Sequence, residues 1–156
     1  MKTDIKILAL IVLFSAQSMV ALAQPADISA IKAVIAKETQ SFFSVDRKNW
    51  EECWLKVPYA YWSYADSTAA SFLEGWETLN KTFDSYFKTA KPSNAEITND
   101  WTEVKIFGNG AYVRFVQKVK AEIEHDDTSQ VRVLEKKDGK WKIICVGAIA
   151  KYPQAK

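Results

Sequence analysis

The stretch from Trp101 to Ala150 constrains the fold of this chain more than any other part of its sequence. Apolar and polar residues alternate along it, which is the pattern of β-strands with one buried face. Three pairs of turn-forming residues divide the stretch into four segments: Asn109-Gly110, Asp126-Asp127 and Asp138-Gly139. Asn-Gly and Asp-Gly between alternating runs are strong signals for two-residue hairpin turns. The stretch therefore predicts a four-stranded antiparallel meander.

The three predicted turns determine which side chains share a face of this meander. The expected opposite pairs include Ile106 with Val113, Val119 with Leu134, Arg132 with Cys145 and Glu135 with Lys142. All three turns agree on one mainly apolar face, which holds Val104, Ile106, Val113, Phe115, Gln117, Val119, Ala121, Arg132, Leu134, Ile143 and Cys145. The polar exceptions on this face are Arg132 and Gln117, and the face contains no carboxylate.

The residues before the meander predict three helices and a short hairpin. The expected helices are one over residues 28–42 capped by Asp27 or Ser29, a second helical segment around Trp50 to Trp54 that Pro58 ends, and a third from Gly75 to Phe87. Residues 59–73 are expected to form a small hairpin or an edge strand. Helices that pack on one sheet give an α+β fold. We expect a cone-shaped fold, in which a curved antiparallel sheet of four main strands plus a short N-terminal hairpin is covered by three helices.

A leader for export is predicted over residues 1–23. Lys2 and Lys6 precede the apolar run over residues 7–14, and residues 21–23 have the small-residue pattern of a cleavage site. The run is too short for a comfortable membrane span, although an uncleaved anchor is the alternative. We therefore expect a secreted or periplasmic protein without a stable membrane span after cleavage, in which residues 24–156 form a single domain.

The charged residues and cysteines argue against several classes of function. The formal net charge is only +2 and no basic stripe is present, which argues against a nucleic-acid partner. The one histidine, His125, lies in the acidic run over residues 122–127 at a predicted turn, so we expect no metal site and no cofactor. Cys53 and Cys145 are expected to be free buried thiols, and a disulfide between them is the alternative.

The segment from Arg132 to Ile143, which reads RVLEKKDGKWKI, resembles a signature of the nuclear transport factor 2-like superfamily. It is similar to the arginine-bearing strand, Asp-Gly turn and Gly-x-Trp strand of the SnoaL-like branch and of the calcium/calmodulin-dependent kinase association domain. Asp46 with Trp50, and Glu74-Gly75 at the start of the third helix, agree with this resemblance. It covers residues 28–149 and implies a conical fold that often dimerises.

The resemblance also implies a pocket around the strand arginine. In the kinase association domain this arginine faces a deep pocket, which places Arg132 inside the cone, and Gln117 stands where that domain has a second pocket arginine. A steroid-isomerase-like site would need a carboxylate base with a tyrosine donor, and an epoxide-hydrolase-like site would need two aspartates bridged by arginine. Because the inward strand face has no carboxylate, no catalytic residue is assigned.

Arg132 is the strongest candidate for a binding residue, because a buried guanidinium needs a hydrogen-bonding or charged partner. Its partner is expected to be either an anionic ligand or one of four carboxylates on the covering elements: Glu52, Asp66, Glu74 and Asp84. The remaining alternative is that Arg132 lies at the solvent-exposed end of the sheet and is hydrated. Gln117 could orient the same ligand. The other residues expected to line the cavity are Trp50, Trp54, Tyr59, Tyr64, Trp76 and Cys145. Aromatic residues at helical spacing are also typical of a simple core.

These features favour an exported small-molecule-binding protein with an aromatic-lined pocket. The first alternative is a SnoaL-like lyase, isomerase or hydrolase, which would need a carboxylate such as Asp66 beside Tyr59 or Tyr64. The second alternative is an interaction module, because the outward sheet face carries apolar residues that a homodimer would cover: Val116, Val131, Val133, Ile144 and Val146.

Overall fold

The computed structural model describes residues 25–120 and 125–150. The chain divides into two compact units, residues 1–30 and 31–156, and the packing described below is that of the second unit. The predicted leader, residues 1–23, lies outside the described residues. Within the described ranges, no helix is both long enough and apolar enough to cross a membrane.

Three helices occur in the described part of the chain. A long helix covers residues 25–43, so Asp27 and Ser29 lie inside it and do not cap its start as expected. The second helix, α2 (Arg47–Cys53), begins at Asp46, whose carboxylate accepts a hydrogen bond from the Asn49 backbone N–H at 3.1 Å. The third helix, α3 (Trp76–Thr89), begins after Gly75 as expected.

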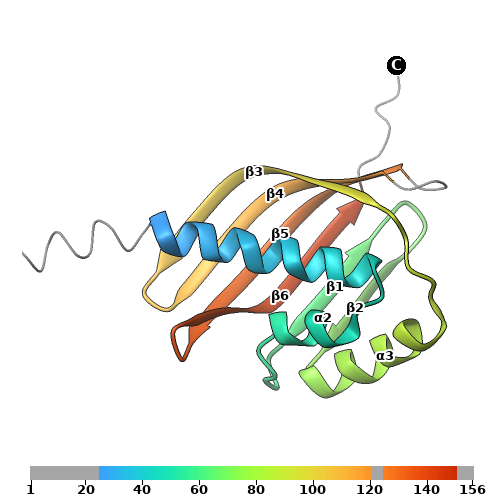
Figure 1. Cartoon of the computed structure of the whole chain (residues 1–156), viewed down its shortest axis with the longest axis horizontal. Coiled ribbons are helices and arrows are strands. Elements are labelled where there is room, and N and C mark those ends of the chain that lie inside the picture. The colour runs from blue at the N-terminus through green and yellow to red at the C-terminus, as the bar shows by residue number, and fades with distance from the viewer. Residues whose placement is uncertain (1–24, 121–124, 151–156) are drawn as a thin grey trace, which may run out of the picture. The chain divides into compact units, whose positions relative to one another are not determined.

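The strands form one mixed sheet of six strands (Figure 1). They are β1 (Tyr61–Ala65), β2 (Ala70–Glu74), β3 (Glu96–Phe107), β4 (Gly110–Lys120), β5 (His125–Lys137) and β6 (Lys140–Ala150). Their order across the sheet is β2-β1-β6-β5-β4-β3, and the neighbours are antiparallel except for the parallel pair β1 and β6. The expected four-stranded meander is present, but the predicted hairpin extends the same sheet and makes it mixed.

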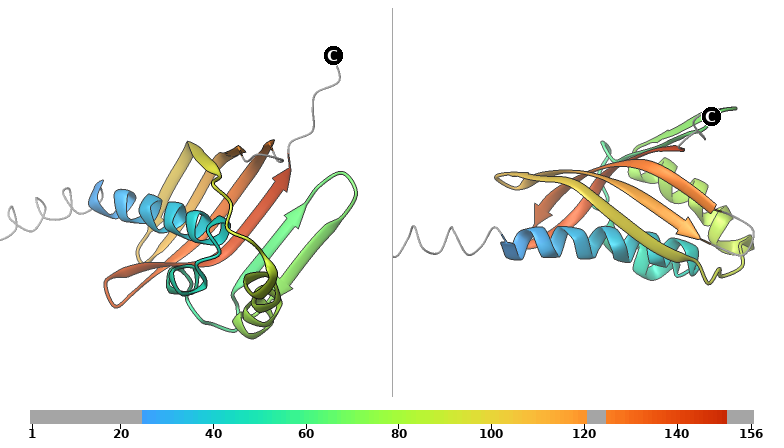
Figure 2. Two further views of the ribbon diagram at one scale, coloured as in Figure 1. Left: turned by 45° about the vertical axis from the view of Figure 1, so that its right-hand side comes forward. Right: turned by 90° about the horizontal axis from the view of Figure 1, so that it is seen from above.

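The helices cover one face of this curved sheet, as the views in Figure 2 show for α2, α3 and the C-terminal part of the long helix. The core between them is apolar and aromatic, because each helix turns its apolar stripe toward the sheet. Its fully buried side chains are Ile31, Ile35, Trp50, Leu79, Val113, Phe115, Leu134 and Ile143. The Trp50 ring lies 5.9 Å from Trp76 and 5.1 Å from Phe83, which joins α2 to α3.

The β3–β4 turn lies one residue earlier than predicted. Gly108 and Asn109 form it, because Gly108 adopts a φ of 59° that glycine tolerates without strain. Ile106 therefore pairs with Ala111 and not with Val113. The pairing partner on β4 thus shifts by two residues, an even number, so side chains still alternate between the faces as predicted and Ile106 stays on its predicted face.

The other two turns were predicted with unequal success. At Asp138-Gly139 both residues have positive φ, and the predicted pair of Leu134 with Ile143 is confirmed. The turn expected at Asp126-Asp127 is wrong, because these residues belong to β5, and the connection that precedes them falls outside the described residues. Leu134 pairs with Ala111 and not with Val119, an even shift that again preserves the faces.

A bulge in β6 changes the remaining predicted pair, because Ile144 is an extra residue without a partner on β5. The register between β5 and β6 shifts between Val133 and Leu134, so Val133 is opposite Cys145 and Arg132 is opposite Val146. Arg132 keeps its inward direction. Cys145 therefore shares the outer face with Val133, and Val146, which was expected on the outer face, is turned inward and buried.

Candidate functional site

Two rows of side chains that cross the sheet form the floor of the site. Residues opposite each other on neighbouring strands present their side chains to the same face. One row contains Trp62, Val146, Arg132 and Val113. The next row contains Tyr64, Ala148, Gln130 and Phe115. Each row thus places an aromatic ring on β1 and a polar side chain on β5.

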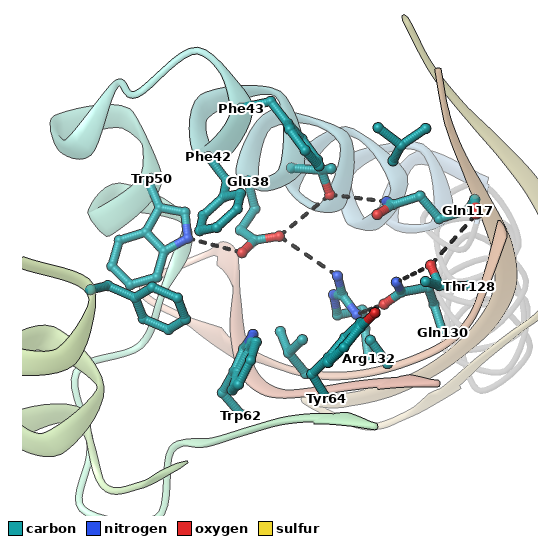
Figure 3. A pocket seen from close by; sticks show the side chains of 15 residues that line it. Glu38, Phe42, Phe43, Trp50, Trp62, Tyr64, Gln117, Thr128, Gln130 and Arg132 are labelled. Atoms are coloured by element: carbon teal, nitrogen blue, oxygen red, sulfur yellow. Dashed lines mark hydrogen bonds and ion pairs between the residues drawn. The ribbon is translucent and has the colours of Figure 1, made fainter. Parts of the chain in front are cut away.

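The long helix places a carboxylate above these rows. Glu38 continues the helical spacing of Ile31 and Ile35, so it belongs to the stripe that faces the sheet. One of its oxygens, Oε2, lies 3.8 Å from Nη2 of Arg132. Figure 3 shows Glu38 between Trp50 and Arg132. Both charged side chains are almost fully buried, with 6% and 3% of their surface exposed.

Glu38 is held by donors on its helix side. Its Oε1 accepts a hydrogen bond from the Trp50 indole N–H at 3.0 Å, and its Oε2 accepts one from the Thr39 hydroxyl at 3.4 Å. Burial raises the pKa of Glu38 above its ordinary value, while the charge of Arg132 and the Trp50 hydrogen bond oppose this rise. The carboxylate is therefore fixed in place by the Trp50 and Thr39 donors.

Arg132 has fewer partners than a buried guanidinium can use. Its Nη1 donates to the Gln130 side-chain oxygen and to the Val131 carbonyl, the latter at 3.4 Å. The guanidinium also lies 5.5 Å from the centre of the Phe115 ring, within range of a cation–π contact. Its Nε has no hydrogen-bond partner among the described residues. Burial lowers the pKa of Arg132, and the Glu38 charge counteracts that effect.

A neutral polar chain continues from this ion pair along the sheet. The Gln117 side-chain amide donates to the Thr39 hydroxyl and to the Asn99 side-chain oxygen, each at 3.1 Å. On β5, the Gln130 amide donates to the Thr128 hydroxyl at 2.6 Å. Amides and hydroxyls can both donate and accept hydrogen bonds. This side of the site therefore offers both kinds of group to a ligand.

These side chains surround a cavity of about 250 Å³. Its lining residues are Glu38, Thr39, Phe42, Phe43, Trp50, Trp62, Tyr64, Phe83, Gln117, Val119, Thr128, Gln130, Arg132, Val146 and Ala148. The aromatic side chains come from the helices and β1, whereas most polar side chains come from β4 and β5 (Figure 3). The cavity is thus apolar on one side and hydrogen-bonding on the other.

Solved structures with the same architecture identify the fold. An NTF2-like protein of unknown function from Shewanella baltica OS155 is 17% identical, with a TM-score of 0.59 over 82% of this chain and 96% of its own. The chain has the nuclear transport factor 2-like fold. A Thiobacillus denitrificans protein, provisionally named as a calcium/calmodulin-dependent protein kinase type II association domain, is 10% identical, with a TM-score of 0.63 over 78% of this chain and 94% of its own.

A third protein with this fold bears the name of an enzyme. It comes from Parabacteroides distasonis, is provisionally named a ketosteroid isomerase, and is 18% identical, with a TM-score of 0.60 over 80% of this chain and 90% of its own. No family model matches the sequence, and no curated protein matches it. At these identities the likeness concerns the nuclear transport factor 2-like fold alone.

Four of the eight predicted site residues line the cavity of this fold: Trp50, Tyr64, Gln117 and Arg132. Arg132 and Gln117 do so because their strands alternate with a period of two, which even shifts in register leave unchanged. Tyr64 comes from β1, which is aligned with the floor only through its parallel pairing to β6. Trp50 reaches the cavity from α2 and binds Glu38.

The other four predicted lining residues lie elsewhere. Tyr59 is 59% exposed, and its hydroxyl donates to Glu135 at 2.9 Å. Trp54 and Trp76 are core residues whose rings are 6.3 Å apart, so helical spacing indicated packing for them and not a cavity wall. Cys145 lies on the outer face because of the bulge in β6, where Ile144 is the extra residue.

The expected carboxylate partners of Arg132 were wrong. Asp66 instead accepts hydrogen bonds from the backbone N–H groups of Thr68 and Ala69 in the β1–β2 turn, at 2.7 and 3.0 Å. The actual partner is Glu38 on the long helix, whereas the four expected carboxylates all lie on later elements. A carboxylate inside an otherwise apolar helical stripe was the sequence signal that could have found it.

The thiols and acidic groups elsewhere form no further site in the described ranges. Cys53 and Cys145 are free, and burial raises the pKa of the Cys53 thiol to about 12, which keeps it protonated. Within residues 25–120 and 125–150, no group of three His, Cys, Asp or Glu side chains is placed to hold a metal ion. The acidic run around His125 lies partly outside these ranges.

Proposed function

We propose that this chain is an exported protein that binds a small molecule in the cavity between the long helix and the sheet. The observation that supports this most strongly is the cavity itself, which combines aromatic walls with a buried polar side formed by Glu38, Arg132, Gln130 and Gln117. Ligand sites in proteins typically have this composition. The leader predicted over residues 1–23 is the reason for proposing export.

The volume of the cavity limits the size of the ligand. A closed apolar cavity of roughly 150 Å³ already binds benzene, and this cavity measures about 250 Å³. It therefore suits a single substituted ring or a molecule of similar size. The ring would pack on Trp62, Phe83 and Tyr64, and the substituent would form hydrogen bonds with the side chains of β4 and β5.

A substitution that fills the cavity tests this proposal. Ala148 is buried and lines the floor beside Tyr64 and Gln130. Ala148→Leu should weaken every cavity ligand by about tenfold or more, because the added side chain occupies the space of the ring. The ligands would come from a library of small cyclic compounds screened by ligand-observed NMR.

The matched control is Ile149→Leu, on the same strand but on the opposite, exposed face. It should leave binding unchanged. If no compound in the library binds the wild-type chain in a way that Ala148→Leu removes, the binding proposal is wrong.

A second candidate is an enzyme of the SnoaL-like kind, with Glu38 as its general acid or base. Its supporting observation is that Glu38 lines the cavity and that burial raises its pKa. Enzymes commonly use burial to raise the pKa of a catalytic carboxyl group. Tyr64 would be the hydroxyl donor in place of Tyr59. If any screened compound is converted, Glu38→Gln should reduce the turnover number by about a hundredfold or more, whereas Asp66→Asn, in the exposed turn, should not.

The outer sheet face supports a third proposal, that two copies of the chain associate through it. Phe72 and Ile149 are 65% and 61% exposed there, and the Phe72 ring is stacked on Tyr61 at 6.4 Å. They border a shallow groove of about 290 Å³ that also includes Val131. Apolar surface of this kind is typical of a protein interface.

A further inference from the structure

The cavity contains one positive and one negative side chain and no other charged group among its described lining residues. These are Arg132 and Glu38, and every other lining side chain is apolar, aromatic, an amide or a hydroxyl. The wall therefore has no net charge when both groups are ionised. This balance is unlike that of a pocket built to bind an anion, where positive charge exceeds negative charge.

The two charged groups of the cavity act on each other. The charge of Arg132 opposes the rise in the pKa of Glu38, and the charge of Glu38 opposes the fall in the pKa of Arg132. The ion pair of Lys37 with Glu52, at 2.9 Å, is formed by exposed side chains that do not line the cavity.

A ligand with a full charge would gain no unpaired countercharge on entering this cavity. Its carboxylate would approach Arg132 but would also meet Glu38, and its ammonium group would meet the reverse situation. Loss of hydration would then be poorly compensated for either ion. An uncharged polar group loses far less on leaving water, and it can form hydrogen bonds with Gln117, Gln130 and Thr39.

We propose that the cavity selects small uncharged molecules with a planar ring and an amide or hydroxyl substituent, and that Glu38 excludes anions by neutralising Arg132. This inference rests on the proposed binding function. It assigns Glu38 a role in specificity, since without Glu38 the unbalanced Arg132 would favour a carboxylate. It also explains how an arginine can lie in a pocket without making that pocket an anion site.

The test uses matched sets of three probes with one ring and one substituent each. Benzamide, benzoate and benzylammonium are one such set, and further sets would carry the same three substituents on other small rings. Dissociation constants would be measured at neutral pH by NMR titration against the wild-type chain and against Ala148→Leu. The amide should bind at least about tenfold more tightly than either ion, and Ala148→Leu should weaken it.

Two variants then identify the residue responsible. Glu38→Gln keeps the volume and one acceptor oxygen but leaves Arg132 unbalanced, so benzoate should gain at least about tenfold relative to benzamide. The double variant Glu38→Gln/Arg132→Gln has no charge in the cavity and should again disfavour both ions. If the single variant does not fold, the double variant and the wild-type order of affinities still test the inference.

The possible results separate the two proposals. Tightest binding of the amide in the wild type, with a gain for the carboxylate in Glu38→Gln, would support the inference. Wild-type binding of benzoate equal to or tighter than that of benzamide, removed by Ala148→Leu, would overturn charge selection and leave the binding function standing. Absence of binding for every probe set would overturn both.

Discussion

At the residue scale, the ion pair of Arg132 with Glu38 is the central feature of this molecule. Its Nη2–Oε2 distance of 3.8 Å lies at the upper limit for an ion pair, and both side chains are removed from water. Buried pairs of this kind contribute little net stability, because desolvation offsets their attraction, yet removal of one partner is costly. The presence of this ion pair is therefore better explained by its position in the wall of the cavity than by a contribution to folding stability.

Arg132→Met should lower the free energy of unfolding by about 3–5 kcal/mol at neutral pH, because it leaves Glu38 buried without a countercharge. The double variant Glu38→Met/Arg132→Met should recover most of this loss, since it replaces both charges by apolar side chains of similar length. Urea unfolding of the two variants and the wild type measures the difference. Equal losses in the single and double variants would show that the charge pair is not the cause.

The loss in Arg132→Met should also depend on pH. Burial raises the pKa of Glu38, and removal of Arg132 takes away a positive charge that opposes this rise. A group with a raised pKa in the folded state adds stability below its unfolded pKa, and this stability is lost as the pH rises through the folded value. The variant should therefore be close to the wild type in acid and fall behind it toward neutral pH.

Unfolding free energies of both chains at a series of pH values provide the measurement for this prediction. The double variant Glu38→Met/Arg132→Met is the control, because it lacks both charged groups. Its difference in unfolding free energy from the wild type should not grow toward neutral pH in the way expected for Arg132→Met. A gap between Arg132→Met and the wild type that stays constant from acid to neutral pH would contradict the assignment to Glu38.

Among the site residues, two on the meander could be predicted from strand alternation, whereas Cys145 depends on a bulge and the aromatic residues depend on tertiary packing. Arg132 and Gln117 were placed correctly because strand alternation is a local property. Trp54 and Trp76 could not be separated from Trp50, since all three are aromatic residues with helical spacing. Glu38 was missed because its role depends on which strand the long helix crosses.

At the element scale, turns and bulges decide which residues meet. Among the described residues, alternation predicted the inner face of the meander correctly apart from one exchange in β6, where Val146 replaces Cys145. Ala121, which was also expected on that face, lies outside the described residues. The exchange results from the extra residue Ile144 in β6, at which the sequence has no glycine or proline to signal a bulge. The pairing partners were less predictable than the faces, because an even shift changes every partner and no face.

The start of α3 depends on the backbone conformation of Gly75, and a substitution can test this. Its φ of 77° and ψ of 145° favour glycine, and an added Cβ would lie 3.2 Å from the Pro58 carbonyl oxygen. Gly75→Ala should therefore lower the free energy of unfolding by about 1–3 kcal/mol, measured by urea unfolding.

The control for this change is Gly110→Ala, where the added Cβ meets nothing closer than 3.5 Å and the φ is not left-handed. It should cause no loss of stability. If both alanine variants were equally stable, backbone strain at the start of α3 would not be the explanation.

At the scale of the whole molecule, the two faces of the sheet lie in different surroundings. The helices cover the inner face, whereas the outer face is exposed and carries Phe72 and Ile149. If two copies associate through this outer face, Phe72→Glu should convert the dimer to a monomer, because it places a charge in an apolar interface. Light scattering after size-exclusion chromatography measures the mass directly.

Phe107→Glu is the matched control for this prediction. Phe107 is similarly exposed, at 68%, but it lies next to the β3–β4 turn and away from Phe72. This variant should keep the mass of the wild type. A wild-type chain that stays monomeric at high concentration would contradict association through the outer face.

The α+β class and the element order could also be predicted at this scale, because helical and strand periodicities separate clearly along the chain. The membership of β1 and β2 in the main sheet could not be predicted. It depends on parallel pairing between the short strand β1 and the last strand, β6, which are far apart in the sequence. No local pattern specifies such a pair.

The parallel pairing of β1 with β6 has a consequence for how the chain acquires its shape during synthesis. Tyr61 pairs with Cys145, and Tyr64 pairs with Ala148, so β1 cannot join the sheet until β6 has been synthesised. In a nascent chain that still lacks β6, the helices can form, but β1 and its aromatic side chains are not yet aligned with the floor of the cavity. High contact order of this kind slows folding, so the cavity would be complete only after β6 has been synthesised.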